Sequence, residues 1–146
     1  MARNQKDATF DYDLRMKDAG LIAADAAWTV SGAAKILTLG DSRVDGRVII
    51  NITAIEIASN DEQYQLILQF SDSATFASGV VPGATLIVGA LETLIGSDTD
   101  TTVGTYELPF TNELNGVIYT YMRGYTNVTG SIATGVNFFA HAALKA

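Results

Sequence analysis

Residues 63–70 read Gln-Tyr-Gln-Leu-Ile-Leu-Gln-Phe, and this stretch decides the fold class. Apolar side chains stand at every second position, with glutamines at most of the positions between them. A period of two predicts a β-strand, because successive side chains of a strand point to opposite faces of its sheet. We therefore expect one core face, and one solvated or interfacial face that carries Gln63, Gln65 and Gln69.

Similar short stretches lie on both sides of this strand, separated by Gly, Asn, Asp and Ser. The expected strands are residues 35–39, 47–58, 84–88, 91–95, 105–110, 117–126 and 131–143. Many short strands with regular turn signals and almost no helical pattern are typical of an antiparallel β-sandwich. The sequence thus predicts an all-β, jelly-roll-like sandwich.

Local breaks in the pattern refine this prediction. The apolar positions change parity between Ile52 and Ile55, which predicts a bulge near residue 54, because one extra residue reverses the faces. Pro82-Gly83 is expected to form a turn, and Pro109 to lie near a strand end, where a missing N–H is tolerated. The Ala-rich residues 19–27 include Gly20 and lack a helical stripe, so we expect mostly loop there.

The N-terminal segment has its own alternation. Residues 9–16 place Phe10, Tyr12, Leu14 and Met16 on one side, with charged residues between them. This pattern predicts an extended arm that lies at a sheet edge or across a neighbouring molecule. We therefore divide the chain into an arm and loop at residues 1–30 and a single sandwich domain at residues 31–146.

Composition excludes several protein classes. The 146 residues are 48% hydrophobic and 17% charged, which is incompatible with a disordered chain. The apolar runs are only a few residues long, so neither a membrane span nor a signal peptide is expected. Cysteine is absent, which excludes disulfides, thiolate zinc sites and cysteine nucleophiles.

The charge is unevenly distributed. The formal net charge is −7, and residues 48–122 contain no Lys or Arg. Binding to a phosphate backbone needs several cations on one face. The sequence therefore argues against a nucleic-acid partner.

No motif indicates catalysis, a cofactor or a metal. His141 is the only histidine, and we expect it to be a partly exposed strand or interface residue. The acidic residues at 60–62 and 98–100 lack the spacing of a calcium loop and are expected in turns. A carboxylate pair for glycoside hydrolysis has no support in the sequence, but because such a pairing is spatial, the alternative of a hydrolase stays open.

One predicted strand is rich in residues typical of binding surfaces. Tyr119, Tyr121, Arg123 and Tyr125 share one parity. Tyr and Arg are enriched at interface hot spots, and tyrosines also line carbohydrate clefts. A core-facing row, a protein interface and a sugar-binding row are the three alternatives for these residues.

Three stretches resemble the jelly-roll cement, or decoration, proteins of tailed-bacteriophage capsids. Residues 28–41 are similar to the family's lead-in to its first strand, residues 65–76 to its central strand, and residues 117–125 with 129–138 to its terminal hairpin. The resemblance implies a structural, non-enzymatic virion protein without a cofactor on the capsid exterior. It further implies that the protein binds the major capsid protein and stabilises contacts between capsomers, as a homodimer or homotrimer assembled in the host cytoplasm.

The sequence thus predicts two interface regions. Phe10, Tyr12 and Leu14 would contact the shell from the arm, while the second region contains Tyr119, Tyr121, Arg123 and Tyr125. No nucleic acid or membrane is expected as a partner. The alternative to a cement protein is a carbohydrate-binding β-sandwich that uses the three tyrosines as stacking platforms.

Overall fold

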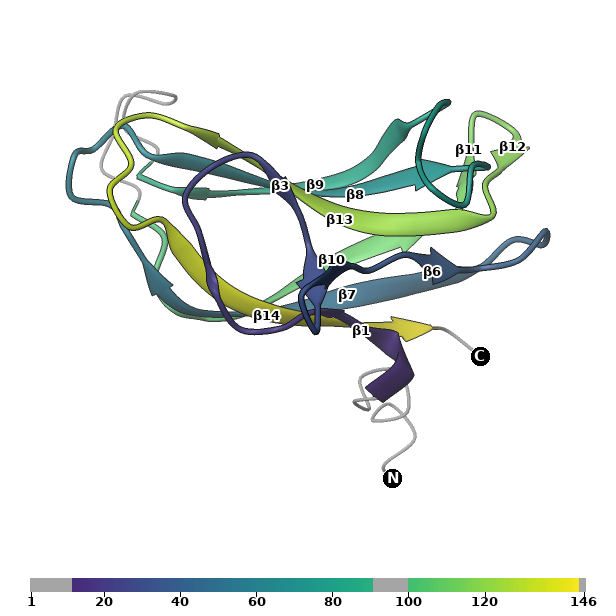
Figure 1. The fold of residues 1–146 in the computed structure, drawn as a ribbon, viewed down its shortest axis with the longest axis horizontal. Coiled ribbons are helices and arrows are strands. Elements are labelled where there is room, and N and C mark those ends of the chain that lie inside the picture. Colours follow the sequence, from purple (N-terminus) through teal and green to yellow (C-terminus); the bar gives the residue numbers. More distant parts are fainter. Residues whose placement is uncertain (1–11, 91–99, 145–146) are drawn as a thin grey trace.

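The computed structural model describes residues 12–90 and 100–144. Two antiparallel sheets pack face to face and form a β-sandwich (Figure 1), which confirms the all-β fold class. The lower sheet in Figure 1 has the order β1-β14-β7-β10, with β2 beside β14, and the upper sheet has the order β3-β13-β8-β9, with β6 beside β13. The lower-sheet strands are β1 (Arg15–Lys17), β2 (Leu21–Ile22), β7 (Asp45–Ile55), β10 (Gly104–Thr111) and β14 (Val136–Leu144), and the upper-sheet strands are β3 (Ala26–Ala27), β6 (Leu37–Thr38), β8 (Gln63–Ser71), β9 (Val81–Gly89) and β13 (Tyr121–Thr129).

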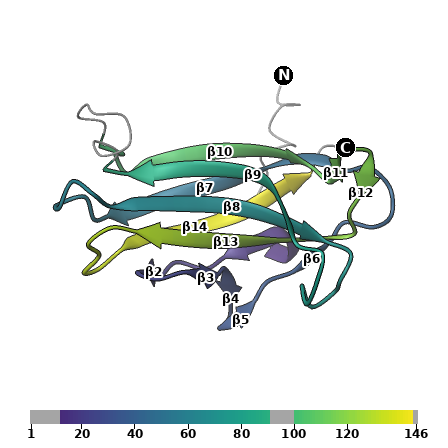
Figure 2. The ribbon, with the colours of Figure 1, turned by 90° about the horizontal axis from the view of Figure 1, so that it is seen from above.

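The long strands wrap across both sheets. β7 and β8 are consecutive strands that lie in different sheets. β10 pairs with β7 and β9 pairs with β8, so the segments β7–β8 and β9–β10 run side by side as one long bent hairpin. β13 and β14 then pair with the free edges of β8 and β7. This wrapping is jelly-roll-like, and Figure 2 shows the long strands running roughly along one direction. Two small hairpins, β4 (Thr29–Val30) with β5 (Ala33–Ala34) and β11 (Glu113–Leu114) with β12 (Val117–Ile118), extend from the sandwich.

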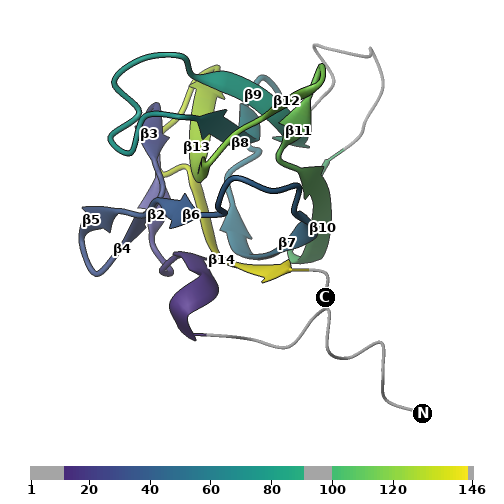
Figure 3. The same ribbon diagram turned by 90° about the vertical axis from the view of Figure 1, so that its right-hand side faces the viewer.

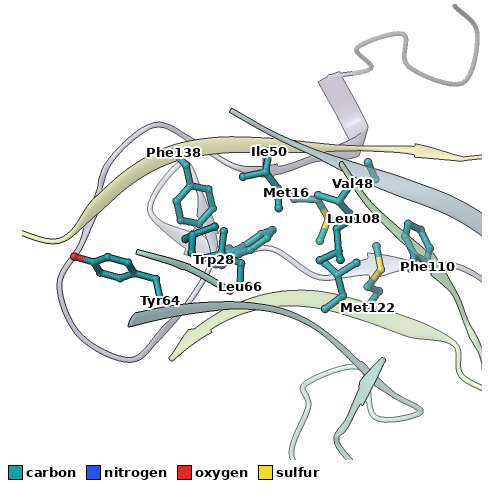
Figure 4. Packing of buried hydrophobic residues seen from close by; sticks show 14 of the residues in the cluster. Met16, Trp28, Val48, Ile50, Tyr64, Leu66, Leu108, Phe110, Met122 and Phe138 are labelled. Atoms are coloured by element: carbon teal, nitrogen blue, oxygen red, sulfur yellow. The ribbon is translucent and has the colours of Figure 1, made fainter. Parts of the chain in front are cut away.

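The core lies between the two sheets. The strand that decided the fold behaves as predicted, because Tyr64, Leu66, Leu68 and Phe70 are each 0% exposed. Figure 4 shows how side chains from both sheets meet around Trp28, whose ring packs edge-on against Phe138 with centroids 5.2 Å apart. The Trp28 Nε1–H donates a 2.8 Å hydrogen bond to the Thr126 hydroxyl, so the one polar atom of the indole is satisfied.

Two strand irregularities bear on the predictions. β14 skips one residue of β7, with Asn137 opposite Ala54 and Phe138 opposite Ile52, which confirms the predicted bulge. A second bulge in β9 contains Gly83, so the prediction of a turn at Pro82-Gly83 is wrong. A side chain at Gly83 would collide with the Phe70 ring, and the bulge brings the β9 backbone against that ring.

Other strand predictions differ in extent. Residues 35–39 contain only the two-residue β6, and residues 117–126 divide into β12 and β13. The expected strand at 91–95 lies outside the described residues. Pro109 lies within β10, which is an edge strand. Proline is tolerated there because one side of an edge strand has no neighbouring strand to bond.

Residues 15–30 belong to the sandwich. β1 and β2 pair with β14, and β3 pairs with β13, while Met16 and Trp28 are both 0% exposed. Residues 12–30 therefore do not form a separate arm. Tyr12–Leu14 form a 3-10 turn (η2) instead of the extended strand expected there, and Figure 3 shows this turn beyond the lower sheet, on the far side from β13.

Candidate binding surface

The predicted tyrosine row is partly brought together. Tyr121, Arg123 and Tyr125 lie on β13 with half-buried side chains that point away from the core, because Met122 and Gly124 between them point inward. Tyr119 lies outside β13 and packs against the core from the segment that precedes it. The core-facing alternative therefore applies in part to Tyr119. The other three residues face outward, as both binding alternatives require.

Arg123 is held in place by three side chains. Its Nε–H donates a 2.9 Å hydrogen bond to Gln69 Oε1 on the neighbouring strand. Its guanidinium lies 4.6 Å from the centre of the Phe76 ring and 5.4 Å from that of Tyr125. Such cation–π contacts are worth about 0.5–1 kcal/mol each at partly exposed sites, so Arg123 is a fixed cation.

Phe76 belongs to the site, although sequence reasoning did not select it. It lies in the loop between β8 and β9, which reaches across to β13, and it is 7% exposed. Its φ of +57° is rare for a bulky residue. A single aromatic in a stretch rich in Ser and Thr was its only signal in the sequence.

The outward-facing residues of β8, β9 and β13 form a surface that we call the tyrosine face. The register places Gln65, Ile67 and Gln69 of β8 beside Asn127, Tyr125 and Arg123 of β13, and beside Ile87, Thr85 and Pro82 of β9. Arg123 is the only charged residue among these nine, although the chain as a whole carries a net charge of −7. Ile67 is only 7% exposed, so the apolar area on this face is small.

The polar groups of this face make few bonds within the protein. Among the described residues, none forms a hydrogen bond with the hydroxyl of Tyr121 or Tyr125, the side-chain amide of Gln65 or Asn127, or Nη1 or Nη2 of Arg123. These donors and acceptors are therefore available to an external partner.

A pocket of about 400 Å³ lies at the end of the same sheet. It is lined by Asp72, Ser73, Ser78, Gly79, Val81 and Tyr119. One carboxylate oxygen of Asp72, Oδ1, accepts hydrogen bonds from the backbone N–H and the hydroxyl of Thr120, which ties the pocket wall to the start of β13. The volume lies within the range of roughly 300–1,000 Å³ that is typical of small-ligand sites.

Acidic residues away from this face stabilise loops. The Glu56 carboxylate accepts hydrogen bonds from the backbone N–H groups of Ala133, Thr134 and Gly135, at 2.6–2.9 Å. These bonds, with Gly135 as the largest contributor, lower the pKa of Glu56 from 4.5 to about 2. Glu56 is therefore ionised at neutral pH and holds the β13–β14 loop.

Two further carboxylates have the same function. Asp61 accepts hydrogen bonds from the N–H and hydroxyl of Ser131, at 3.0 and 2.9 Å. Glu62, which is 0% exposed, accepts bonds from the N–H groups of Ser59 and Asp61. The prediction of turn residues at 60–62 is thus confirmed, while residues 98 and 99 lie outside the described range.

The N-terminal segment is anchored by a buried cation. The Lys17 ammonium donates hydrogen bonds of 2.8–3.0 Å to the carbonyls of Asp18, Gly20 and Phe138, and it lies 4.3 Å from the centre of the Phe138 ring. Burial lowers the pKa of Lys17 from 10.5 to about 8, against the opposing effect of Asp18. Lys17 is still mostly charged at pH 7 and joins β1 to β14.

The predicted arm residues are placed in part. Leu14 is half-buried and packs against the core, so it is part of the fold and not a freely exposed contact. Phe10 and the side chain of Tyr12 lie outside the described part of the chain.

His141 lies on strand β14, as one form of the expectation had it, but the expected partial exposure is wrong. It is 7% exposed and lies between Arg15 of β1 and Ile49 of β7 in the strand register. Ile49, on the same outer face of this sheet, is also 7% exposed. Residues on this part of the outer face are therefore buried, although strand alternation alone predicts that they are exposed.

Within residues 12–90 and 100–144, no group of three or more His, Asp or Glu is arranged to hold a metal ion. In the same ranges, no helix has the length and apolar character needed to cross a bilayer.

No protein-family model matches the chain, and no curated protein matches its sequence.

Proposed function

We propose that this protein is a capsid decoration, or cement, protein of a tailed bacteriophage. It would bind the outside of the assembled shell as a homodimer or homotrimer and stabilise contacts between capsomers of the major capsid protein. The proposal rests on the resemblance of residues 28–41, 65–76 and 117–138 to that family. A non-enzymatic role is consistent with the carboxylates of Glu56, Asp61 and Glu62, which are occupied by backbone N–H donors.

The observation that best supports this function is the anchoring of β1. Lys17 binds three carbonyls and Met16 is fully buried, so β1 is a rigid point close to the start of the described chain. A rigid attachment transmits force from a bound segment to the domain, as a protein that holds a shell together requires. Residues 1–11 contain Phe10 together with Arg3, Lys6, Asp7 and Asp11, and can supply both apolar and charged contacts.

Truncation tests this proposal, and the structure determines where to cut. A deletion that reaches residue 17 would remove Met16 and Lys17 from the core, so only residues 1–11 should be deleted. Wild type, the truncated protein and a variant with residues 2–11 in scrambled order are mixed with expanded capsids that lack decoration. Binding is measured by co-sedimentation, and the thermal stability of the capsid by calorimetry.

We expect wild type to bind and to raise the melting temperature of the capsid. The truncated and scrambled proteins should keep their own melting temperatures but lose most of the binding. Normal decoration by both variants would refute the role of the arm, and failure of wild type to bind any expanded capsid would refute the function. Light scattering after size-exclusion chromatography measures the expected dimer or trimer.

A further inference from the structure

We infer that the tyrosine face and the adjoining pocket at Tyr119 form a binding site for a neutral oligosaccharide. This site is independent of the proposed docking through residues 1–11. It lies on the opposite sheet from β1, and Figures 1 and 3 both show η2 on the far side of the sandwich from β13. A partner held through the N-terminal side would therefore leave the tyrosine face exposed.

The first argument comes from the available hydrogen-bonding groups. Sugars are recognised through many hydroxyl groups, each of which can donate and accept, so a sugar site needs a mixture of hydrogen-bond donors and acceptors. The face supplies the hydroxyls of Tyr121 and Tyr125, the amides of Gln65 and Asn127, and the Nη donors of Arg123, none of which bonds a described residue. In contrast, the carboxylates of Glu56, Asp61 and Glu62 are already bonded within the protein.

The second argument is the small apolar area. A stable protein interface needs a hydrophobic centre, because buried apolar surface supplies most of the association energy. On this face Ile67 is already buried, and Ile87 at its margin is 37% exposed. Half-buried tyrosine rings beside amides suit the mixed polar and apolar faces of a pyranose ring better than they suit an apolar protein surface.

The third argument is charge. The net charge of −7 repels an acidic oligosaccharide, whereas a neutral one can approach this face, whose nine positions carry no Asp or Glu, without that cost. The one cation, Arg123, is stacked between Phe76 and Tyr125, so it is already in position and little conformational entropy is lost when a sugar binds. A second copy of this chain would place Arg123 against an equally acid-free face, without a carboxylate partner.

The fourth argument is the shape of the surface. The strand from Tyr121 to Asn127 offers an extended row about 20 Å long at roughly 3.3 Å per residue. The pocket adds a concave end with a tyrosine, two serines and Asp72, whose second carboxylate oxygen makes no bond with a described residue. A chain of several sugar units, with its terminal unit in the pocket, fits this arrangement.

The experiment uses the full-length protein on an array of oligosaccharides that end in glucose, galactose, mannose or N-acetylglucosamine, with sialylated and sulfated oligosaccharides as acidic comparators. We expect binding to a subset of the neutral oligosaccharides. The oligosaccharide with the strongest signal is then titrated in solution by calorimetry against wild type and variants.

Four variants test the assignment. Tyr125→Ala and Arg123→Lys should weaken binding by about tenfold or more, which corresponds to about 1.4 kcal/mol. Asp72→Asn keeps the oxygen that binds Thr120, and it tests the pocket alone. Phe139→Ala is the matched control, because this aromatic is 39% exposed on the outer face of the other sheet, and its affinity should stay within about twofold of wild type.

Several results would overturn the inference. These are no binding by wild type to any neutral oligosaccharide, binding to acidic oligosaccharides only, or unchanged affinity in both Tyr125→Ala and Arg123→Lys. Loss of self-association in these two variants without loss of sugar binding would assign the face to a protein partner instead. The melting temperature of each variant shows whether a loss of binding is due to unfolding. Capsid binding is not measured here, so this result is independent of the proposed function.

Discussion

Gly124 is the position where a single added carbon should disrupt the fold. It lies on β13 and faces the core directly against the Trp28 indole. A Cβ built there would lie 2.0 Å from Trp28 Cδ2 and Cε3. Carbon atoms pack at about 3.5–4.0 Å, so in Gly124→Ala the ring has to move by about 1.5 Å.

The cost follows from the contacts of Trp28. Overpacking of this kind costs about 1–3 kcal/mol. Moving the ring also breaks the Trp28–Thr126 hydrogen bond and leaves a buried N–H unsatisfied, which costs about 1–3 kcal/mol more. The expected loss of about 4 kcal/mol lowers the melting temperature of a domain of this size by about 10 °C.

Calorimetry measures this change, and Trp28 reports it directly because it is the only tryptophan in the chain. Its fluorescence should shift to longer wavelength in Gly124→Ala. Gly20→Ala is the matched control, because a Cβ there meets nothing within 4 Å. In the double variant Gly124→Ala/Trp28→Phe the smaller ring leaves room for the added carbon. Its loss of stability should therefore be smaller than the sum of the losses in the two single variants. A melting temperature within about 2 °C of wild type for Gly124→Ala, with unchanged emission, would refute the reasoning.

Three further variants test polar groups that hold the fold. Lys17→Met should lower the free energy of unfolding at pH 7 by about 2 kcal/mol in urea titrations, because buried carbonyls lose their donor. In wild type the free energy of unfolding should also rise between about pH 8 and 10.5, because the unfolded chain binds more protons there than the native one. A rise of equal size in Lys17→Met would contradict the assignment to Lys17. Glu56→Gln should be less stable than wild type at pH 7. The difference should shrink as the pH falls from 4.5 towards about 2, where wild-type Glu56 becomes protonated. A difference in urea midpoints that stays constant over this range would argue against the role of the Glu56 carboxylate in holding the β13–β14 loop. Asn112→Ala removes a fully buried amide that bonds three backbone groups at 2.7–3.1 Å, and it should cost about 2–4 kcal/mol in the same assay, while a loss below about 0.5 kcal/mol would show that water replaces the amide.

Local patterns in the sequence predicted the strands well. The alternation in residues 63–70 has the expected buried face, and the change of parity after Ile52 corresponds to a bulge. Both signals are local, because the period of side-chain directions is a property of the strand itself. Gly83 was misread as part of a turn because proline and glycine also occur at bulges, and only the register with β8 distinguishes the two.

Long-range contacts were much less predictable. The carbonyls that bind Lys17 include that of Phe138, which is 121 positions away in the sequence. His141 is buried on the outer face of a sheet, although its alternation indicated exposure. Phe76 reaches Arg123 only because its loop crosses to β13, and no sequence pattern carries that information.

By itself, the sequence of this protein determined the class of the fold, the core face of its strands and the absence of cysteine chemistry. Those properties depend on residue type and on the near-neighbour geometry of an extended chain. The tertiary structure decided which polar residues are used by the fold and which remain available. It assigned Glu56, Asp61 and Lys17 to internal bonds, whereas no described residue bonds the hydroxyls of Tyr121 and Tyr125 or the side-chain amides of Gln65 and Asn127. This distinction depends on strand order and loop crossings, which bring together residues that are far apart in the chain.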